Sequence, residues 1–208
     1  MKLTLIRHTS LQVPSGVCYG QSDIDVAATF FDEAAATKAK IANMRFDAVY
    51  TSPLQRCHKL AQALNIGEAV HDERLKELHF GDWEMQAWDD IPRDYFDVWT
   101  QDYANLAPPN GETFSQMQQR NINFLNDIMK AGLQPQGSSL QNISAKADYS
   151  CEKANICALT HGGVIRSLLA HVLNMPLKGL FRFNVDYGSV TQIEFKKDAV
   201  PKINFVNL

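Results

Sequence analysis

The sequence has few cysteines and no long apolar run. Its four cysteines, Cys18, Cys57, Cys151 and Cys157, form no Cys-x-x-Cys pair, so neither a redox motif nor a disulfide framework is indicated. Because disulfides accumulate in oxidising compartments, this pattern favours a cytoplasmic protein in which Cys57 and Cys157 are buried thiols. No stretch approaches membrane-spanning length, and the N-terminal apolar run is too short for a secretion signal. We therefore expect no membrane association.

An excess of positive charge is also absent. The 20 Lys and Arg residues are outnumbered by 23 Asp and Glu residues, which gives a net charge of −3. This balance leaves no electrostatic case for binding nucleic acid, so any affinity for phosphate must be local. The 208 residues, 45% of them hydrophobic and 21% charged, suit a globular protein with a sizeable core. We expect a single domain over residues 1–208.

Several catalytic signatures are missing as well. No cysteine is followed six residues later by an arginine, which excludes a cysteine-based phosphatase, and there is no Gly-x-Ser-x-Gly elbow, P-loop or His-Glu-x-x-His motif. The segment Asp23-Ile24-Asp25 imitates an aspartyl-phosphatase motif, but it follows a glycine turn where that chemistry expects an apolar strand. No grouping of His and Asp indicates a metal site, so we expect neither a metal nor a cofactor.

Two short apolar runs each end in a histidine. The run that begins at Leu3 predicts a buried strand that delivers Arg7 and His8, and the run over 156–160 is followed by His161, two glycines and a helix. Ligands bind at strand ends in α/β sheets, and a helix N-terminus favours anions. A guanidinium can hold a phosphoryl group, and a neutral imidazole can attack phosphorus. Taken alone, the Arg-His pair would favour the simpler interpretation, that it marks the end of a strand.

Strand and helix patterns alternate along the rest of the chain. Apolar spacing predicts helices over residues 32–44, 113–129 and 163–173, and one more that begins at Ser52 as N-cap with Pro53 in its first turn. Strands are predicted at 47–50, 69–70 and 189–195, an irregular aromatic-rich segment at 75–99, and a polar surface insertion at about 133–153. This alternation favours a parallel-rich sheet covered on both faces.

Five segments, in this order, resemble motifs of the histidine phosphatase superfamily, also called phosphoglycerate-mutase-like. They are Arg7-His8, Thr51-Ser52-Pro53-Leu54-Gln55-Arg56, residues 77–84, Pro109-Asn110-Gly111-Glu112 and Thr160-His161-Gly162. Residues 80–85 and 181–186 are further similar to the α-ribazole-5′-phosphate phosphatases of cobalamin assembly. The resemblance implies an α/β fold, a three-layer α/β/α sandwich with a mostly parallel central sheet and a small helical cap at about residues 77–112.

The same resemblance implies a set of roles. His8 would be the nucleophile and form a phosphohistidine, while Arg7 and Arg56 would clamp the phosphoryl oxygens. His161 would add a hydrogen bond to the phosphoryl group, and Glu77 would donate a proton to the leaving oxygen and then activate water. Taken singly, Arg56 could be a solvated helix residue, and Glu77 could merely pair with a neighbouring cation. The family order of all five favours the site.

The first loop departs from the family pattern. Thr9 replaces the usual glycine after Arg-His, and the asparagine that often follows has no clear counterpart. Thr9 or Ser10 could supply a hydroxyl group instead, and Gln21 is a candidate substrate contact. Gly162 is expected to bring backbone close to the phosphate. To attack, His8 needs a neutral ring whose other nitrogen meets an acceptor, which the backbone of Gly162 or Gly163 could supply.

These residues favour a phosphatase that acts on a small phosphorylated metabolite, and the resemblance implies α-ribazole 5′-phosphate as the preferred substrate. A broad-specificity or sugar-bisphosphate histidine phosphatase is the alternative enzyme, and a non-catalytic protein that binds a phosphorylated ligand is the alternative of another class. Cap aromatics could stack on a flat base or simply pack the cap, and packing is favoured for most of them: Trp83, Trp88, Tyr95, Phe96, Trp99 and Tyr103.

Overall fold

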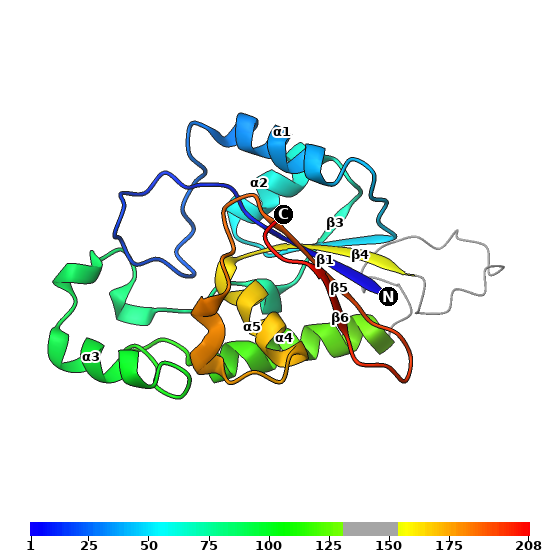
Figure 1. Cartoon of the computed structure of the whole chain (residues 1–208). Helices are drawn as coiled ribbons and strands as arrows, with labels where there is room; N and C mark the ends of the chain where they lie inside the picture. Colours follow the sequence, from blue (N-terminus) through cyan, green and yellow to red (C-terminus); the bar gives the residue numbers. More distant parts are fainter. Residues whose placement is uncertain (131–153) are drawn as a thin grey trace.

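A six-stranded sheet runs through the middle of the molecule (Figure 1). The computed structural model describes residues 1–130 and 154–208, so the polar segment expected at about 133–153 lies outside the described residues. The strands are β1 (Lys2–Arg7), β2 (Ala48–Thr51), β3 (Ala69–His71), β4 (Asn155–Thr160), β5 (Val190–Glu194) and β6 (Lys202–Phe205). The helices are α1 (Phe30–Lys40), α2 (Gln55–Leu64), α3 (Arg93–Gln101), α4 (Phe114–Lys130) and α5 (Gly162–Val172).

The strand order is β3-β2-β4-β1-β5-β6. The pairs β2–β3, β2–β4 and β1–β4 are parallel, whereas β5 runs antiparallel to β1 and β6 antiparallel to β5. The expected mostly parallel sheet is therefore confirmed. The parallel register aligns Arg7 of β1 with Thr160 of β4, so the residues that follow these two strands emerge side by side.

Helices cover both faces of the sheet, α1 and α2 on one and α4 and α5 on the other (Figure 1). Each face has its own apolar core: Leu5 packs in the cluster that includes α4 and α5, and Ile6 packs in the cluster that includes α1 and α2. Because side chains alternate along a strand, a strand buried on both faces must be apolar at successive positions. This explains why Leu3, Leu5 and Ile6 of β1 are all apolar, with Thr4 the one buried polar residue among them.

Some element boundaries differ from the sequence prediction. The second helix begins at Gln55 rather than at Ser52, and the Ser52 hydroxyl contacts both the His161 ring and, over 3.4 Å, the Leu54 backbone N–H. The first helix begins at Phe30, and β6 has no counterpart among the predicted strands. Cys57 and Cys157 are fully buried, as expected.

Residues 73–112 contain α3 and three short 3₁₀ turns, Glu73–Leu75, Gly81–Trp83 and Trp88–Asp90. Their aromatic rings pack against one another, and the Trp99 ring centroid lies 5.4 Å from that of Trp83 and 5.9 Å from that of Phe96. Packing, the favoured interpretation of these aromatics, is what the structure shows. Within residues 1–130 and 154–208, no helix is long and apolar enough to cross a membrane.

Candidate active site

The two strand-end histidines meet at the carboxyl edge of the sheet. The His8 backbone N–H donates to the Thr160 carbonyl over 3.1 Å, which extends the β1–β4 pairing past both strands. The imidazole rings of His8 and His161 lie 5.1 Å apart between centroids, and both side chains are buried. Adjacent parallel strands thus bring together two residues from distant parts of the sequence.

The His8 ring has one nitrogen fixed and one available. Its Nδ1 lies 2.7 Å from the Thr9 carbonyl oxygen. Because a carbonyl can only accept, Nδ1 carries the proton, and the Nε2 lone pair is left to attack. Burial, Arg56 and Arg7 hold the pKa of His8 well below 6.5. A backbone carbonyl is the acceptor, as expected. The sequence left open which carbonyl serves, and it is that of Thr9 rather than that of Gly162 or Gly163.

Arg56 is fully buried, so the interpretation of this residue as a solvated helix position is wrong. Its Nε donates to His161 Nδ1 over 3.2 Å, and its terminal nitrogens donate to the carbonyls of Ser22 and Gly20 over 2.8 and 2.5 Å. Each terminal nitrogen keeps a second N–H group, which suits a phosphoryl oxygen. His161 accepts at Nδ1 and therefore donates from Nε2 to the Ser52 hydroxyl over 2.9 Å.

Arg7 is held from two sides. Its Nη1 donates to the Val185 carbonyl over 2.6 Å, and its Cζ lies 3.9 Å from the centroid of the Tyr187 ring. Its Nε is buried and, among the described residues, has no hydrogen-bond partner. A side chain on Gly162 would bring Cβ to 3.4 Å from this nitrogen. The glycine at the start of α5 therefore leaves room for an unsatisfied cationic donor beside a helix N-terminus, an arrangement that favours an anion.

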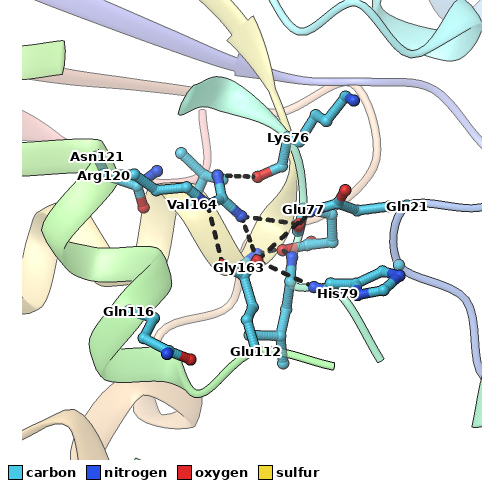
Figure 2. Close-up of polar contacts among 12 residues, drawn as sticks. Gln21, Lys76, Glu77, His79, Glu112, Gln116, Arg120, Asn121, Gly163 and Val164 are labelled. Carbon is cyan, nitrogen blue, oxygen red and sulfur yellow. Dashed lines mark hydrogen bonds and ion pairs between the residues drawn. The ribbon is translucent and has the colours of Figure 1, made fainter. Parts of the chain in front are cut away.

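Glu77 rests against the start of the same helix (Figure 2). The Gly163 N–H donates to its Oε2 over 3.0 Å, and the Leu78 N–H donates to its Oε1 over 2.9 Å. A Cβ on Gly163 would lie 2.2 Å from Oε1, so only glycine lets the carboxyl group approach this closely. The neighbouring cations have other partners, since Lys76 pairs with Glu73 and Arg74 with Asp72. Glu77 is thus free to act in the site.

Comparison with known proteins agrees with this arrangement. A family model described as the histidine phosphatase superfamily (branch 1) matches residues 3–207. The chain belongs to the histidine phosphatase superfamily. It is a phosphatase, that is, a hydrolase.

Several relatives of this histidine phosphatase carry more specific names. It is 26% identical over 204 residues to an adenosylcobalamin/alpha-ribazole phosphatase of Escherichia coli (strain K12), which covers 95% of this chain and 91% of the relative. It is 23% identical to a putative phosphoserine phosphatase 2 of Hydrogenobacter thermophilus, over 94% of this chain and 90% of the relative. The solved structure of the alpha-ribazole phosphatase from Shigella flexneri superposes with a TM-score of 0.82 at 25% identity, covering 100% of this chain and 96% of that one.

In the first loop, Thr9 and Ser10, the two residues expected to supply a hydroxyl group, differ in their contacts. Thr9 is fully buried, and its Oγ1 has no hydrogen-bond partner among the described residues. Ser10 instead donates from its backbone N–H to Glu33 Oε2 over 2.8 Å, and its hydroxyl contacts the same carboxyl group. Thr9 therefore keeps a hydroxyl available and Ser10 does not. The Gln21 side chain donates to the Glu77 carbonyl over 3.1 Å, which places it beside the carboxyl-bearing segment.

Tyr19 and Tyr187, to which the sequence analysis assigns no role, contact each other and lie over Arg56 and Arg7. The hydroxyl groups of Tyr19 and Tyr187 lie 2.5 Å apart, and burial together with this contact raises the pKa of Tyr19. The Tyr187 ring stacks on Arg7, and the centroid of the Tyr19 ring lies 5.9 Å from Arg56 Cζ. Their position on loops far apart in sequence gave no signal that they would meet.

Arg166 is a further residue of the site to which the sequence analysis assigns no role. One turn along α5 from Gly162, its Nη1 would lie 2.9 Å from a Cβ on that glycine, and its Nε donates to the Phe183 carbonyl over 3.0 Å. Burial and the nearby Arg7 lower its pKa. The four-residue spacing from Gly162 on a predicted helix was the available signal, because side chains on a helix point back toward its N-terminus. Arg166 adds a third guanidinium near Arg7 and so increases the attraction for an anion.

Metal-binding side chains are not grouped in the part of the chain that the structure describes. There, no three His, Cys, Asp or Glu side chains lie close enough together to hold a metal ion.

Proposed function

We propose that this histidine phosphatase hydrolyses a small phosphomonoester through a phosphohistidine on His8, and that α-ribazole 5′-phosphate is its preferred substrate. The observation that carries the mechanism is the His8–Thr9 hydrogen bond of 2.7 Å, which holds the ring proton on Nδ1 and leaves Nε2 with a lone pair. The lowered pKa of His8 keeps this ring neutral in the presence of two cations. A neutral imidazole beside guanidinium groups is suited to attack a bound phosphoryl dianion.

In the first step, the Nε2 lone pair of His8 forms a bond to phosphorus. The bond between phosphorus and the leaving oxygen breaks, and its electron pair stays on that oxygen. Glu77, in its protonated form, gives its proton to this oxygen and releases the neutral alcohol. Arg7 and Arg56 hold the phosphoryl oxygens, and the free hydroxyl of Thr9 and the backbone of Gly162 add donors around them.

In the second step, water attacks phosphorus from the side that the alcohol has left. Glu77 takes a proton from this water, the nitrogen–phosphorus bond breaks, and its electron pair returns to Nε2 of His8. Inorganic phosphate is released, and Glu77 is again protonated. His161 carries its proton on Nε2, and this N–H group, now bonded to Ser52, is the proposed donor to a phosphoryl oxygen. Gln21, next to the Glu77 carbonyl, is the proposed contact for the alcohol part of the substrate.

The proposed substrate is supported by the names of relatives. The Escherichia coli relative and the Shigella flexneri structure are both named for alpha-ribazole phosphatase. Residues 80–85 and 181–186 of this chain resemble the same group. A sugar bisphosphate is the second candidate, because a fructose-2,6-bisphosphatase of Danio rerio is 27% identical over 192 residues.

A panel of phosphomonoesters, ranked by kcat/KM in the presence of EDTA, tests this proposal. We expect turnover of p-nitrophenyl phosphate and the highest kcat/KM for α-ribazole 5′-phosphate. A similar kcat/KM for sugar bisphosphates and phosphoserine would replace the substrate proposal with a broad-specificity phosphatase. Absence of turnover with every compound, together with tight binding of one of them, would instead indicate a non-catalytic protein that binds a phosphorylated ligand.

A further inference from the structure

A cluster of partly buried polar groups lies next to Glu77 (Figure 2). Its centre is Arg120 of α4, and all five of its N–H groups donate hydrogen bonds. Two go to Glu112, from Nη2 over 2.6 Å and from Nε over 3.2 Å. The other three go to main-chain carbonyls, those of Arg74 over 2.7 Å, Lys76 over 2.6 Å and Glu77 over 2.9 Å.

The three carbonyl groups that Arg120 binds all belong to one short segment, residues 74–77. Glu77 lies in a segment that is neither helix nor strand, so no regular hydrogen-bond pattern holds its backbone in place. Two of the three carbonyl oxygens that Arg120 binds belong to Lys76 and to Glu77 itself. The Arg120 guanidinium is rigid and planar, so donors to these oxygens fix the orientation of two successive peptide groups. The direction in which the Glu77 side chain leaves the backbone follows from that orientation.

Glu112, which precedes α4, also holds the backbone that follows Glu77. Its Oε1 accepts from the His79 backbone N–H over 3.0 Å, in addition to Arg120. Two backbone hydrogen bonds of 2.9 Å join the segment that contains His79 to the segment that contains Glu112. They run from the Glu112 N–H to the His79 carbonyl and from the Asp82 N–H to the Pro109 carbonyl. The side chains of Arg120 and Glu112 are 19% and 18% exposed, so water screens their ion pair only in part.

We infer that Arg120 and Glu112 are positioning residues for the proton donor of the phosphatase: they hold the backbone on both sides of Glu77 so that its carboxyl group stays against the Gly163 N–H. The inference rests on the proposed role of Glu77. Neither residue takes part in the chemistry. Losing the pair lets the carboxyl group move away from the leaving oxygen, and small misplacements of a catalytic group reduce rates substantially.

The test compares single-turnover phosphorylation rates for p-nitrophenyl phosphate, a good leaving group, and phenyl phosphate, a poor one. In Arg120→Gln we expect the rate with phenyl phosphate to fall roughly tenfold to a hundredfold further than the rate with p-nitrophenyl phosphate. Glu112→Gln should shift the ratio in the same direction by a smaller factor. In a Glu77→Gln background, Arg120→Gln should leave the ratio unchanged, because the donor that it positions is gone.

Arg74→Gln is the matched control. Arg74 also joins this segment to α4, through Asp72 and Asp127, but its side chain does not contact the Glu77 carbonyl. Its loss should lower the melting temperature without changing the leaving-group ratio. If Arg120→Gln does not fold, Glu112→Gln and Arg120→Lys provide the same comparison. An unchanged ratio in the folded variants, or a further change in the Glu77→Gln background, would overturn the positioning role.

Crystal structures of Arg120→Gln and Arg74→Gln test the positioning role independently of the proposed function. The Glu77 carboxyl group should lie away from the Gly163 N–H in Arg120→Gln and against it in Arg74→Gln. A wild-type protein that turns over no phosphomonoester would refute the proposed function, while the structural comparison would still decide whether Arg120 orients Glu77. A carboxyl group that stays in place in Arg120→Gln would refute the positioning role even in an active phosphatase.

Discussion

Arg56 Nε and His161 Nδ1 share a hydrogen bond of 3.2 Å inside the protein, where neither side chain meets solvent. This bond gives each residue one orientation. His161 must carry its proton on Nε2, and Arg56 must direct its terminal nitrogens toward the loop carbonyls of Gly20 and Ser22. A positively charged group that is buried, fixed and still has unused N–H groups can bind the transition state without reorganising.

Arg56→Lys should therefore lower kcat as well as raise KM. Lysine keeps the charge but has no Nε to bond to His161 and no paired terminal nitrogens. We expect kcat/KM to fall by about 10²–10³, as for other transition-state donors, and vanadate to inhibit more weakly. Arg93→Lys is the control, because Arg93 is exposed, pairs with Asp89 and lies over the Phe96 ring. Wild-type kcat/KM and vanadate affinity in Arg56→Lys would remove Arg56 from the site.

His8→Ala should abolish turnover while the protein stays folded, because the ring lies past the end of β1, outside the two apolar clusters of the core, and water can replace it. Labelling of the wild type by a phosphorylated substrate should be acid-labile and alkali-stable, and it should disappear in the variant. His171→Ala, which replaces an exposed histidine of α5, should label normally. Retained activity in His8→Ala would rule out the covalent mechanism.

Glu77→Gln should slow substrates with poor leaving groups much more than p-nitrophenyl phosphate. An amide does not donate a proton as a carboxylic acid does, and general acid catalysis contributes about 10²–10⁴-fold. Single-turnover phosphorylation rates make the comparison, since dephosphorylation can limit both substrates at steady state. Glu73→Gln, at an exposed carboxylate paired with Lys76, is the control. Equal losses for both leaving groups would exclude Glu77 as the acid.

Gly163→Ala should imitate Glu77→Gln in its leaving-group dependence. A methyl group at this position would lie 2.2 Å from Glu77 Oε1, so the carboxyl group must move. At Gly179, by contrast, a methyl group would meet the flexible end of Met175 at 3.0 Å, and Gly179→Ala should retain activity. A Gly163→Ala enzyme with the wild-type leaving-group ratio would show that the contact between Glu77 and α5 is dispensable.

Acid pH should destabilise the fold through its two buried imidazoles. Burial and the neighbouring arginines hold the pKa of His8 and of His161 well below 6.5, whereas in the unfolded chain each titrates near about 6.5. Below that pH the unfolded chain binds more protons than the folded one. The free energy of unfolding should thus be constant above about pH 6.5 from this source and fall below it, by up to ~1.4 kcal/mol per pH unit for each histidine.

Urea unfolding between pH 5 and pH 7.5 measures this dependence. His8→Ala removes one of the two titrating groups, so its free energy of unfolding should fall less steeply with decreasing pH than that of the wild type. A variant with the wild-type slope would show that His8 does not resist protonation in the folded protein.

Much of the parallel part of the fold could be predicted from the sequence, because β1 and β4 are apolar on both faces and leave few alternatives to a buried strand. The same runs placed Arg7, His8 and His161 at strand ends. The start of α2 could not be predicted in this way. A serine before a proline is a good N-cap by local preference, but the Ser52 hydroxyl bonds to the His161 ring, which is 109 residues away in sequence.

Other parts of the site depend on contacts between segments that carry no local pattern. Arg120 lies on a helix that was predicted well, yet an arginine on an amphipathic helix usually faces solvent, and the carbonyls that it holds belong to an irregular segment. The carbonyl partner of His8 could not be assigned from the sequence, because any backbone carbonyl near the ring can accept, and the next residue supplies it. Tyr19 and Tyr187 meet only because two loops from opposite ends of the chain close over the same strand ends.

The place of β1 in the sheet has a consequence for how the enzyme is made. β1 lies between β4 and β5, so both of its hydrogen-bonded neighbours are synthesised late, after residue 154. A ribosome therefore releases the strand that carries His8 long before the strands that flank it, and long-range pairing of this kind forms slowly. The proposed nucleophile, His8, is therefore synthesised well before the strands that hold it in place, and the site can form only after β4 and β5 have emerged.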